Sequence, residues 1–184
     1  MLFRSTTGST ITFAGNNTGY ADGTGTSALF SSPTGITKDA TGNFYVADRN
    51  NNRIRKITPD GVVTTFAGSG SGGAIVNGTG IAAGFYSPYG ITSDQSGNLF
   101  VGEYSNQAVR KITSTALVST LAGNGTAGNQ NGTGINATFN QPVGLAVDAS
   151  GNVFIADYIN HLIRKITPAG VVTTFAGRDR KSVV

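Results

Sequence analysis

The chain has 184 residues, of which 27 are Gly, 12% are charged and none is Cys, and its formal net charge is +4. Few charges and many glycines suit short strands and tight turns, and no window keeps a helical period, which excludes a helical fold. The lack of Cys excludes disulfides and cysteine-bound metals, and no apolar run reaches the roughly 18 residues of a membrane-spanning helix.

A sequence unit of nearly constant length occurs three times along the chain. Its clearest copy, at 35–68, reads GITKDATGNFYVADRNNNRIRKITPDGVVTTFAG, and further copies lie at 90–123 and 144–177. The motif that ends the unit also occurs alone near the start of the chain, as TITFAG at 10–15. The glycines that end these motifs are 53, 55 and 54 residues apart; they are Gly15, Gly68, Gly123 and Gly177. A fixed period of this length indicates one supersecondary unit per copy, with each unit stacked on its neighbours.

Turn signals divide the first unit into four strands. The Asp-Ala-Thr-Gly-Asn phrase is typical of an Asx turn followed by a Gly with positive φ, and the Thr-Pro-Asp-Gly phrase is typical of a type I hairpin turn. The strands are expected at 35–39, 43–48, 53–58 and 62–68. The short connections predict an up-and-down antiparallel sheet. The Asp that recurs in the first turn is interpreted as a turn residue rather than a metal ligand; it is Asp39, Asp94 and Asp148.

The second unit departs from the other two at its last hairpin. The other copies have Pro, then Asp or Ala, then Gly at this hairpin, whereas the second unit has Ser114, Thr115 and Ala116. Because the turn glycine is missing, we expect this hairpin to be the loosest of the three.

Apolar side chains on both faces of the strand at 43–48 require a cover on each face. Four-stranded sheets that repeat and pack face to face are the blades of a β-propeller. We therefore predict an all-β fold: a β-propeller of four-stranded antiparallel blades, with three complete blades plus one extra N-terminal outer strand in an open partial ring. The predicted segments are an outer strand of a preceding or closing blade at 1–15, blades with their links at 16–68, 69–123 and 124–177, and a tail at 178–184.

A Gly-rich link precedes each blade and contains the motif Asp/Asn-Gly-Thr-Gly. The motif begins at Asp22, Asn77 and Asn131. A calcium loop needs several oxygen ligands and more charge. One carboxylate that is replaced by Asn in the sibling links argues against a metal at this position.

Several phrases recur in the units: Pro-x-Gly-Ile/Leu, Asp-x-x-Gly-Asn-x-Phe/Tyr-Val/Ile, Ala-Asp and Asn-x-x-Ile-Arg-Lys-Ile. Together they resemble NHL-type propeller repeats from about Thr10 to Gly177, and the longer link resembles bacterial, often cell-surface, members of that family. The resemblance implies an interaction platform that binds proteins, peptides, glycans or RNA, with a few enzymes among the relatives. It also implies a secreted or cell-surface protein, although the start of the chain lacks the apolar core of a signal peptide.

Charged residues that recur in every copy are interpreted as structural. Each Arg of the third strand is expected to pair with the acidic residue on the adjacent second strand, because neighbouring strands favour such pairs. Arg and the Lys that follows it point to opposite faces of the strand, which argues against a basic groove for nucleic acid. These structural repeat positions are Asp48, Arg55, Glu103, Arg110, Asp157 and Arg164.

The loop between the second and third strands differs from copy to copy, and in this topology it emerges on the same face as the links. Loops placed by a rigid scaffold carry function, and amide, Tyr, Arg and His groups suit the recognition of a polar ligand. The candidate ligand-binding residues are Arg49, Asn50, Asn52, Tyr104, Asn106, Gln107, Tyr158, Asn160 and His161.

We therefore expect a non-enzymatic scaffold that binds a protein, peptide or glycan through this loop face, with no catalytic residue, metal or cofactor. His161 is the single His, and one His cannot provide a multi-histidine metal site. Two alternatives stay open: a propeller lactonase or hydrolase whose site is completed by missing blades, and an RNA-binding propeller. RNA would need basic loop residues beside aromatic groups that stack on bases, and only Arg49 with Tyr104 and Tyr158 approaches that pattern.

The two ends of the chain carry expectations of their own. Three blades do not close a ring, so we expect a fragment of a larger protein that self-associates through its open blade ends. The segment 178–184 breaks the repeat. Its DRKSVV sequence matches the translation of a common sequencing adapter, and we interpret it as non-native.

Overall fold

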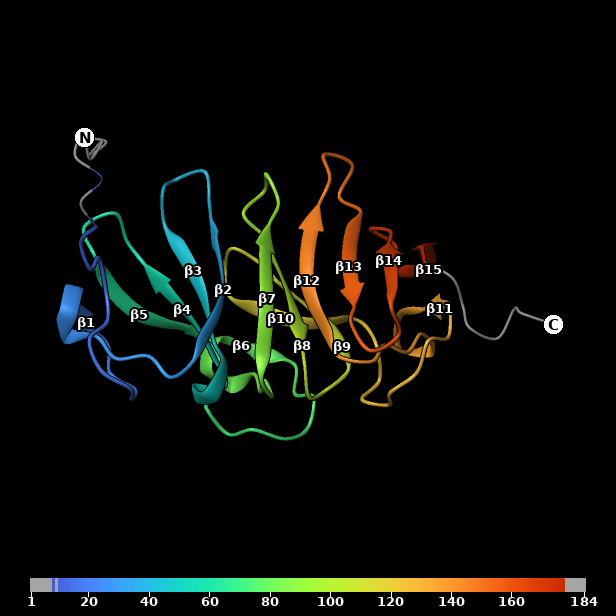
Figure 1. Ribbon diagram of the computed structural model, residues 1–184, viewed down its shortest axis with the longest axis horizontal. Coiled ribbons are helices and arrows are strands. Elements are labelled where there is room, and N and C mark those ends of the chain that lie inside the picture. Colours follow the sequence, from blue (N-terminus) through green and yellow to red (C-terminus); the bar gives the residue numbers. More distant parts are fainter. Residues whose placement is uncertain (1–7, 9, 178–184) are drawn as a thin grey trace.

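The structure, a computed structural model, describes residue 8 and residues 10–177, which form three five-stranded antiparallel sheets standing side by side (Figure 1). The first blade contains β1 (Gly23–Thr24), β2 (Pro33–Lys38), β3 (Phe44–Asp48), β4 (Arg53–Ile57) and β5 (Val62–Ala67). The second contains β6 (Gly78–Thr79), β7 (Pro88–Ser93), β8 (Leu99–Glu103), β9 (Ala108–Ile112) and β10 (Leu117–Ala122). The third contains β11 (Gly132–Thr133), β12 (Pro142–Val147), β13 (Val153–Asp157), β14 (Leu162–Ile166) and β15 (Val171–Ala176).

The helical content consists of single 3₁₀ turns. These are η1 (Gly25–Ser27), η2 (Arg49–Asn51), η3 (Gly80–Ala82) and η4 (Gly134–Asn136). Within the described part of the chain, no helix is long and apolar enough to cross a membrane. The all-β propeller architecture predicted from the repeat is thereby confirmed.

Each blade has one strand more than the sequence predicts. The spatial order in the first sheet is β1-β5-β4-β3-β2, and the short β1 extends the sheet because Gly23 pairs with Val63 and Thr24 with Val62. Gly25 follows with φ +58 and donates its N–H to Gly61 O at 2.9 Å. The link motif that was expected to form a loop therefore covers the outer edge of the blade, where backbone groups would otherwise be unpaired.

The inner strands β2, β7 and β12 lie next to one another where the three blades meet (Figure 1). Thr34 Oγ1 in β2 donates a hydrogen bond of 2.8 Å to Tyr89 O in β7. A Cβ atom at Gly35 would lie 2.6 Å from Tyr89 O, and one at Gly90 would overlap Val143 O. The glycine of the Pro-x-Gly phrase is therefore required for the close approach of neighbouring blades.

Apolar side chains fill the space between neighbouring blades. One cluster joins Ile54 of the first blade to Leu99 of the second, and another joins Phe100 of the second blade to Ile155 of the third. Ile91 in β7 is 6% exposed, whereas its repeat equivalent Ile36 in β2 is 61% exposed. Each blade thus relies on its neighbour for burial, as in other stacked-repeat proteins.

Residues 10–15 form no strand, although the sequence predicts an outer strand at 1–15. The segment nevertheless lies where an outer strand meets the following blade: Gly15 N–H donates to Gly25 O, as Gly68 N–H donates to Gly80 O, both at 3.1 Å. The described residues offer it no partner strand on its other side, so no sheet forms there. The tail at 178–184 and most of the remaining N-terminal residues lie outside the described part of the chain.

The last hairpin of the second blade keeps its shape without a turn glycine. Ala116 N–H donates to Thr113 O at 2.9 Å, just as Gly61 N–H donates to Thr58 O at 2.9 Å in the first blade. Ala116 has φ +63, a conformation that costs an L-residue about 1–2 kcal/mol. The missing glycine therefore leaves the hydrogen bonds intact and strains the backbone instead.

We expect Ala116→Gly to raise the free energy of unfolding by about 1 kcal/mol, because the relief of strain exceeds the entropy that Gly adds to the unfolded chain. Urea denaturation measures the change. Ala169→Gly is the control, since Ala169 occupies the equivalent hairpin of the third blade without a positive φ. Equal effects of the two substitutions would contradict the prediction.

Candidate functional site

A buried Arg lies at the centre of each blade. Arg55 is fully buried, and its Nη1 donates to Asp48 Oδ2 and to Leu29 O, both at 3.0 Å. Its Nη2 donates to Ala21 O at 2.8 Å and to Asp22 Oδ1 at 2.7 Å. One side chain therefore joins β3 and β4 to the link that precedes the blade.

The other two blades repeat this arrangement. Arg110 is ion-paired with Glu103, and Arg164 with Asp157, and all of these side chains are fully buried. A buried charge is tolerated when it is paired and hydrogen-bonded. Each ion pair runs diagonally across two strands, because the register places Val46, Val101 and Ile155 directly opposite Arg55, Arg110 and Arg164. A Phe of the link packs on each Arg, with its ring centroid 5.2 or 5.3 Å from the guanidinium carbon. These residues are Phe30, Phe85 and Phe139.

The first residue of the Asp/Asn-Gly-Thr-Gly motif accepts a hydrogen bond from the Arg of its blade. Asp22 Oδ1 accepts from Arg55 at 2.7 Å, and Asn77 Oδ1 and Asn131 Oδ1 accept at 2.9 Å in the other blades. An amide oxygen serves this purpose as a carboxylate does, which explains why Asp and Asn alternate. Among the described residues, no group of three or more His, Cys, Asp or Glu could hold a metal.

Several candidate amides of the loops are engaged within the protein. Asn106 Nδ2 donates to Glu103 Oε2 at 2.6 Å, and Asn160 Nδ2 donates at 2.8 Å to the acidic partner in its own blade. Asn50 Nδ2 donates to Ser32 Oγ at 2.9 Å. The Asn50 bond ties its loop to the preceding link, whereas the Asn106 and Asn160 bonds close their loops onto the end of the second strand. These bonds do not bring the three amides into a common cavity.

The last residue of each loop has a left-handed backbone, and in the first two blades its side chain joins the next blade. Asn52, Gln107 and His161 have φ values of +52, +50 and +57. Asn52 Oδ1 accepts from Ser87 N–H at 2.9 Å, and Gln107 Oε1 accepts from Gln141 N–H at 2.6 Å. Both bonds cross to the next blade. His161 has the same position in the third blade, where it lines a hollow on that blade's open face.

The remaining candidates converge. Arg49, Tyr104 and Tyr158 line one cavity of about 400 Å³, together with Tyr89 and Val143. Arg49 begins η2, the two loop tyrosines directly follow β8 and β13, and the two additional residues lie in the inner strands β7 and β12. The cavity therefore lies where β7 and β12 begin and where the loops after β3, β8 and β13 emerge. This end of the inner strands β7 and β12 is the lower one in Figure 1.

Only two positions of the repeat supply the whole lining. The first is the loop position occupied by Arg49, Tyr104 and Tyr158, and the second is the variable residue of Pro-x-Gly, represented by Tyr89 and Val143. Sequence reasoning missed Tyr89 and Val143 because the candidates came only from the loops between the second and third strands. Their variation between copies, the criterion that selected the loops, could have identified them.

Arg49 lies against two aromatic rings that also contact each other. Its guanidinium carbon lies 5.4 Å from the Tyr89 ring centroid and 5.1 Å from the Tyr104 ring centroid. The two rings are stacked, with centroids 5.8 Å apart and an interplanar angle of 28°. Cation–π contacts of this kind fix a guanidinium without using its N–H donors. No ion pair within the described ranges involves Arg49.

The turns at the opposite end of the blades are closed by Asp side chains. Asp39 Oδ1 accepts from the N–H groups of Thr41 and Asn43, both at 2.9 Å, and Tyr45 Oη donates to Asp39 Oδ2 at 3.1 Å. Burial acts to raise the pKa of Asp39, but the hydrogen bonds from Asn43, Thr41 and Tyr45 together outweigh it and lower the pKa to about 2. The same Asx turn recurs at Asp94 and Asp148.

We expect the chain to lose stability as the pH falls from about 4 to about 2. Asp39 has a folded-state pKa of about 2 against an ordinary 3.8, so its contribution is complete above 3.8 and is lost as the pH falls through the folded value. Solvent screening limits the effect to no more than about 1 kcal/mol. Urea denaturation across this range should show a smaller acid loss for Asp39→Asn than for Asp60→Asn in an exposed hairpin; equal losses would contradict the assignment.

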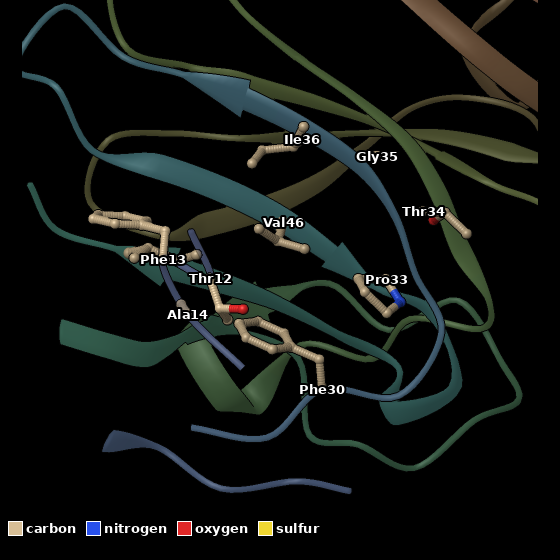
Figure 2. Close-up of a pocket in the computed structure, with 10 residues that line it drawn as sticks. Thr12, Phe13, Ala14, Phe30, Pro33, Thr34, Gly35, Ile36 and Val46 are labelled. Atoms are coloured by element: carbon tan, nitrogen blue, oxygen red, sulfur yellow. The ribbon is translucent and has the colours of Figure 1, made fainter. Parts of the chain in front are cut away.

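A second, apolar hollow of about 380 Å³ lies on the open face of the first blade (Figure 2). Phe13, Phe30 and Ile36 surround Val46 there, as Figure 2 shows. The equivalent of Ile36 in the second blade is buried against a neighbouring blade. This hollow is therefore a blade-packing surface rather than a pocket for a small ligand.

Comparisons with known proteins match this architecture. The NHL repeat family model matches residues 30–57 and 139–166, in the first and third blades. NHL repeat-containing protein 2 from Bos taurus is 32% identical over 151 residues, which are 74% of this chain and 21% of the relative. The chain thus spans about a fifth of that protein.

Solved structures show the same fold. A protein of unknown function from Bacteroides thetaiotaomicron VPI-5482 is 34% identical with a TM-score of 0.63, over 72% of this chain and 33% of that one. Virginiamycin B lyase from Staphylococcus aureus is 22% identical with a TM-score of 0.53, over 78% of this chain and 40% of that one. From its repeats, its blades and these relatives, the chain belongs to the NHL-repeat β-propeller family.

Proposed function

We propose that the chain is part of a non-enzymatic interaction scaffold that binds a protein, peptide or glycan through its loop face. The observation that carries the proposal is the cavity that Tyr89, Tyr104 and Tyr158 line together with Arg49. Tyr and Arg are the side chains most often responsible for binding energy at protein interfaces. A concave site with a few convergent polar groups is the usual form of a binding site.

Selection of ligands from a displayed peptide library and from a glycan array tests this function. Tyr104→Ala should reduce the binding of the selected ligands by about tenfold or more, as expected for an interface residue of this type. Gln95→Ala is the control, because Gln95 lies in an exposed turn at the opposite end of the second blade. Ligands that bind both variants equally well would place the interaction elsewhere.

RNA binding is the second candidate, and the contact of Arg49 with Tyr104 favours it, because aromatic and guanidinium planes can stack on unpaired bases. Salt dependence separates the two functions. Neutralisation of several phosphates makes affinity fall steeply with salt concentration, whereas binding through one charged contact does not. A steep salt slope with single-stranded RNA would therefore favour this second candidate.

The enzymatic alternative concerns a longer protein, because this chain spans only about a fifth of the relative described above. A lactonase or hydrolase would need acidic and amide ligands at the channel, and the lining of the described cavity is one Arg, three Tyr and one Val. The lyase relative shares the fold at low identity and supports no activity here.

We also propose that the isolated chain self-associates through its open blade faces. The support is the exposed apolar surface around Ile36 on the first blade and around Phe175 on the third blade. These surfaces match the two sides of the interfaces that the three blades already form with one another.

A further inference from the structure

We propose that the cavity around Arg49 is a recognition site for a peptide carboxylate. The inference rests on the proposed function, because it names the chemistry of the ligand that the same cavity takes. The cavity is defined by Arg49, Tyr89, Tyr104, Val143 and Tyr158.

The first step of the argument concerns the free donors of Arg49. Its neighbours Arg53 and Arg55 use their terminal nitrogens within the protein, Arg53 on Asn51 O and Ser69 O, and Arg55 on buried acceptors of its blade. The side chain of Arg49 makes no such hydrogen bond to the described residues. Its guanidinium is therefore the one cation at this end of the inner strands that is both oriented and unoccupied within the described chain.

The second step concerns charge. The acidic residues beneath the loops, Asp48, Glu103 and Asp157, are each buried and paired with the Arg of their own blade. They are neutralised and do not face the cavity. Arg49 thus gives the cavity a positive charge, and an anion is the ligand that complements it.

The third step separates carboxylates from other ligands. A carboxylate only accepts hydrogen bonds and fits the planar donor edge of a guanidinium in a bidentate manner. The rings of Tyr89 and Tyr104 hold that plane in place, which preserves the bidentate geometry. A sugar presents many hydroxyl donors, and the lining has no carboxylate or amide to accept them. Nucleic acid presents a row of phosphates to a cavity with a single cation.

The fourth step concerns the rest of the ligand. Tyr158 is 57% exposed beside the cavity, and Val143 lies opposite in the inner strand β12. Tyr rings offer large, rigid contact surfaces with a polar end, and they suit the aliphatic part of a side chain and the peptide backbone next to it. We therefore infer that the ligand is a short acidic peptide segment.

Fluorescence anisotropy with labelled peptide pools tests the inference. In one pair of pools, the first has a fixed central Glu and the second has Gln in its place. A second pair differs only in having a free or an amidated C-terminus. We expect the Glu pool or the free C-terminus pool to bind about tenfold to hundredfold more tightly than its neutral counterpart, as for a hydrogen bond to a charged group. The pair that shows the difference identifies the source of the carboxylate.

Variants of the chain complete the test. Arg49→Gln should abolish the preference for the charged pool. Arg49→Lys keeps the positive charge but should lose most of that preference, because Lys lacks the two parallel N–H donors of the guanidinium. Arg53→Gln is the matched control: it removes the same charge at the same end of the blades and should leave the preference intact. Thermal unfolding of each variant verifies that the fold is kept.

Three results would overturn the inference. These are equal binding of the charged and neutral pools, no binding of any pool, and tighter binding of glucuronate or of a short RNA than of the Glu pool. If Tyr104→Ala weakens library ligands while charged and neutral pools bind alike, the interaction scaffold stands and the carboxylate specificity fails. If Tyr104→Ala has no effect on any ligand, both fail.

Discussion

Replacing Arg110 with Met should lower the free energy of unfolding by about 3–5 kcal/mol, the cost of leaving one member of a buried ion pair uncompensated. Arg110 and Glu103 are both fully buried, and Arg110 also donates to Gly84 O, Val76 O and Asn77 Oδ1. The substitution removes the partner of the carboxylate and the donors for the link at the same time. Chemical denaturation measures the loss.

The pH dependence of this variant separates the buried charge from the lost packing. Burial raises the pKa of Glu103 above its ordinary 4.5 even though Arg110 lies beside it. A raised folded-state pKa gives stability that is present at low pH and is lost as the pH rises through that value. In the Arg110→Met variant, the destabilisation should therefore shrink as the pH falls from neutral toward the ordinary pKa of 4.5.

A double variant provides the control for this prediction. Glu103→Gln combined with Arg110→Met removes the unpaired charge and should recover part of the loss at neutral pH. It should also lose the pH dependence. If the single and double variants are equally destabilised at every pH, the cost comes from packing and not from the charge.

The sequence predicted the blades well because the repeat multiplies every local signal. The turn at Asp39 recurs at Asp94 and Asp148, and each of these turns forms as the Asx pattern indicates. Pairing between Arg and the acidic residue follows from adjacent strands, which local patterns define. Features that depend on neighbouring strands in one hairpin are therefore within reach of sequence reasoning.

Features that cross from the link to the blade were not predicted. Asp22 and Arg55 are 33 residues apart in the sequence, and their contact depends on how the link crosses the outer edge. The two-residue strand β1 depends on the same crossing, because Gly23 and Thr24 alone carry no strand signal. Long-range geometry of this kind is determined by the assembled blade.

The candidate site was predicted in part. Variation between copies drew attention to Arg49, Tyr104 and Tyr158, which line one cavity, and equally to Asn52 and Gln107, which join neighbouring blades. A signal for the latter two was present, since Asn and similar residues are enriched among non-glycine residues with positive φ. Variation alone does not separate a residue that faces a ligand from one that faces the next blade.

The isolated chain should form a dimer or a larger assembly in analytical ultracentrifugation at micromolar concentration. Ile36 is 61% exposed on the open face of the first blade, and Phe175 is 62% exposed on the open face of the third. Figure 2 shows the apolar hollow that Ile36, Phe13 and Phe30 form around Val46. In the interior of the molecule the corresponding surfaces meet, and Ile91 is 6% exposed.

Such an interface is heterologous, because one face of a copy meets the opposite face of another copy. Ile36→Lys and Phe175→Lys each damage one of these faces, and each should weaken self-association by about tenfold or more. Both residues are exposed, so neither substitution should unfold the chain. Ile81→Lys is the matched control, because Ile81 is 70% exposed in η3 and does not line either open face.

A mixture of the two Lys variants gives the sharpest test of this arrangement. The intact third-blade face of the Ile36→Lys chain can meet the intact first-blade face of the Phe175→Lys chain, so the mixture should recover a dimer with one interface. Each variant alone should sediment as a monomer. A wild-type chain that is monomeric at every concentration would contradict the prediction. A single Lys variant that still dimerises alone would show that the copies meet through like faces instead, and a mixture that stays monomeric while the wild type associates would contradict the proposed pairing of opposite faces.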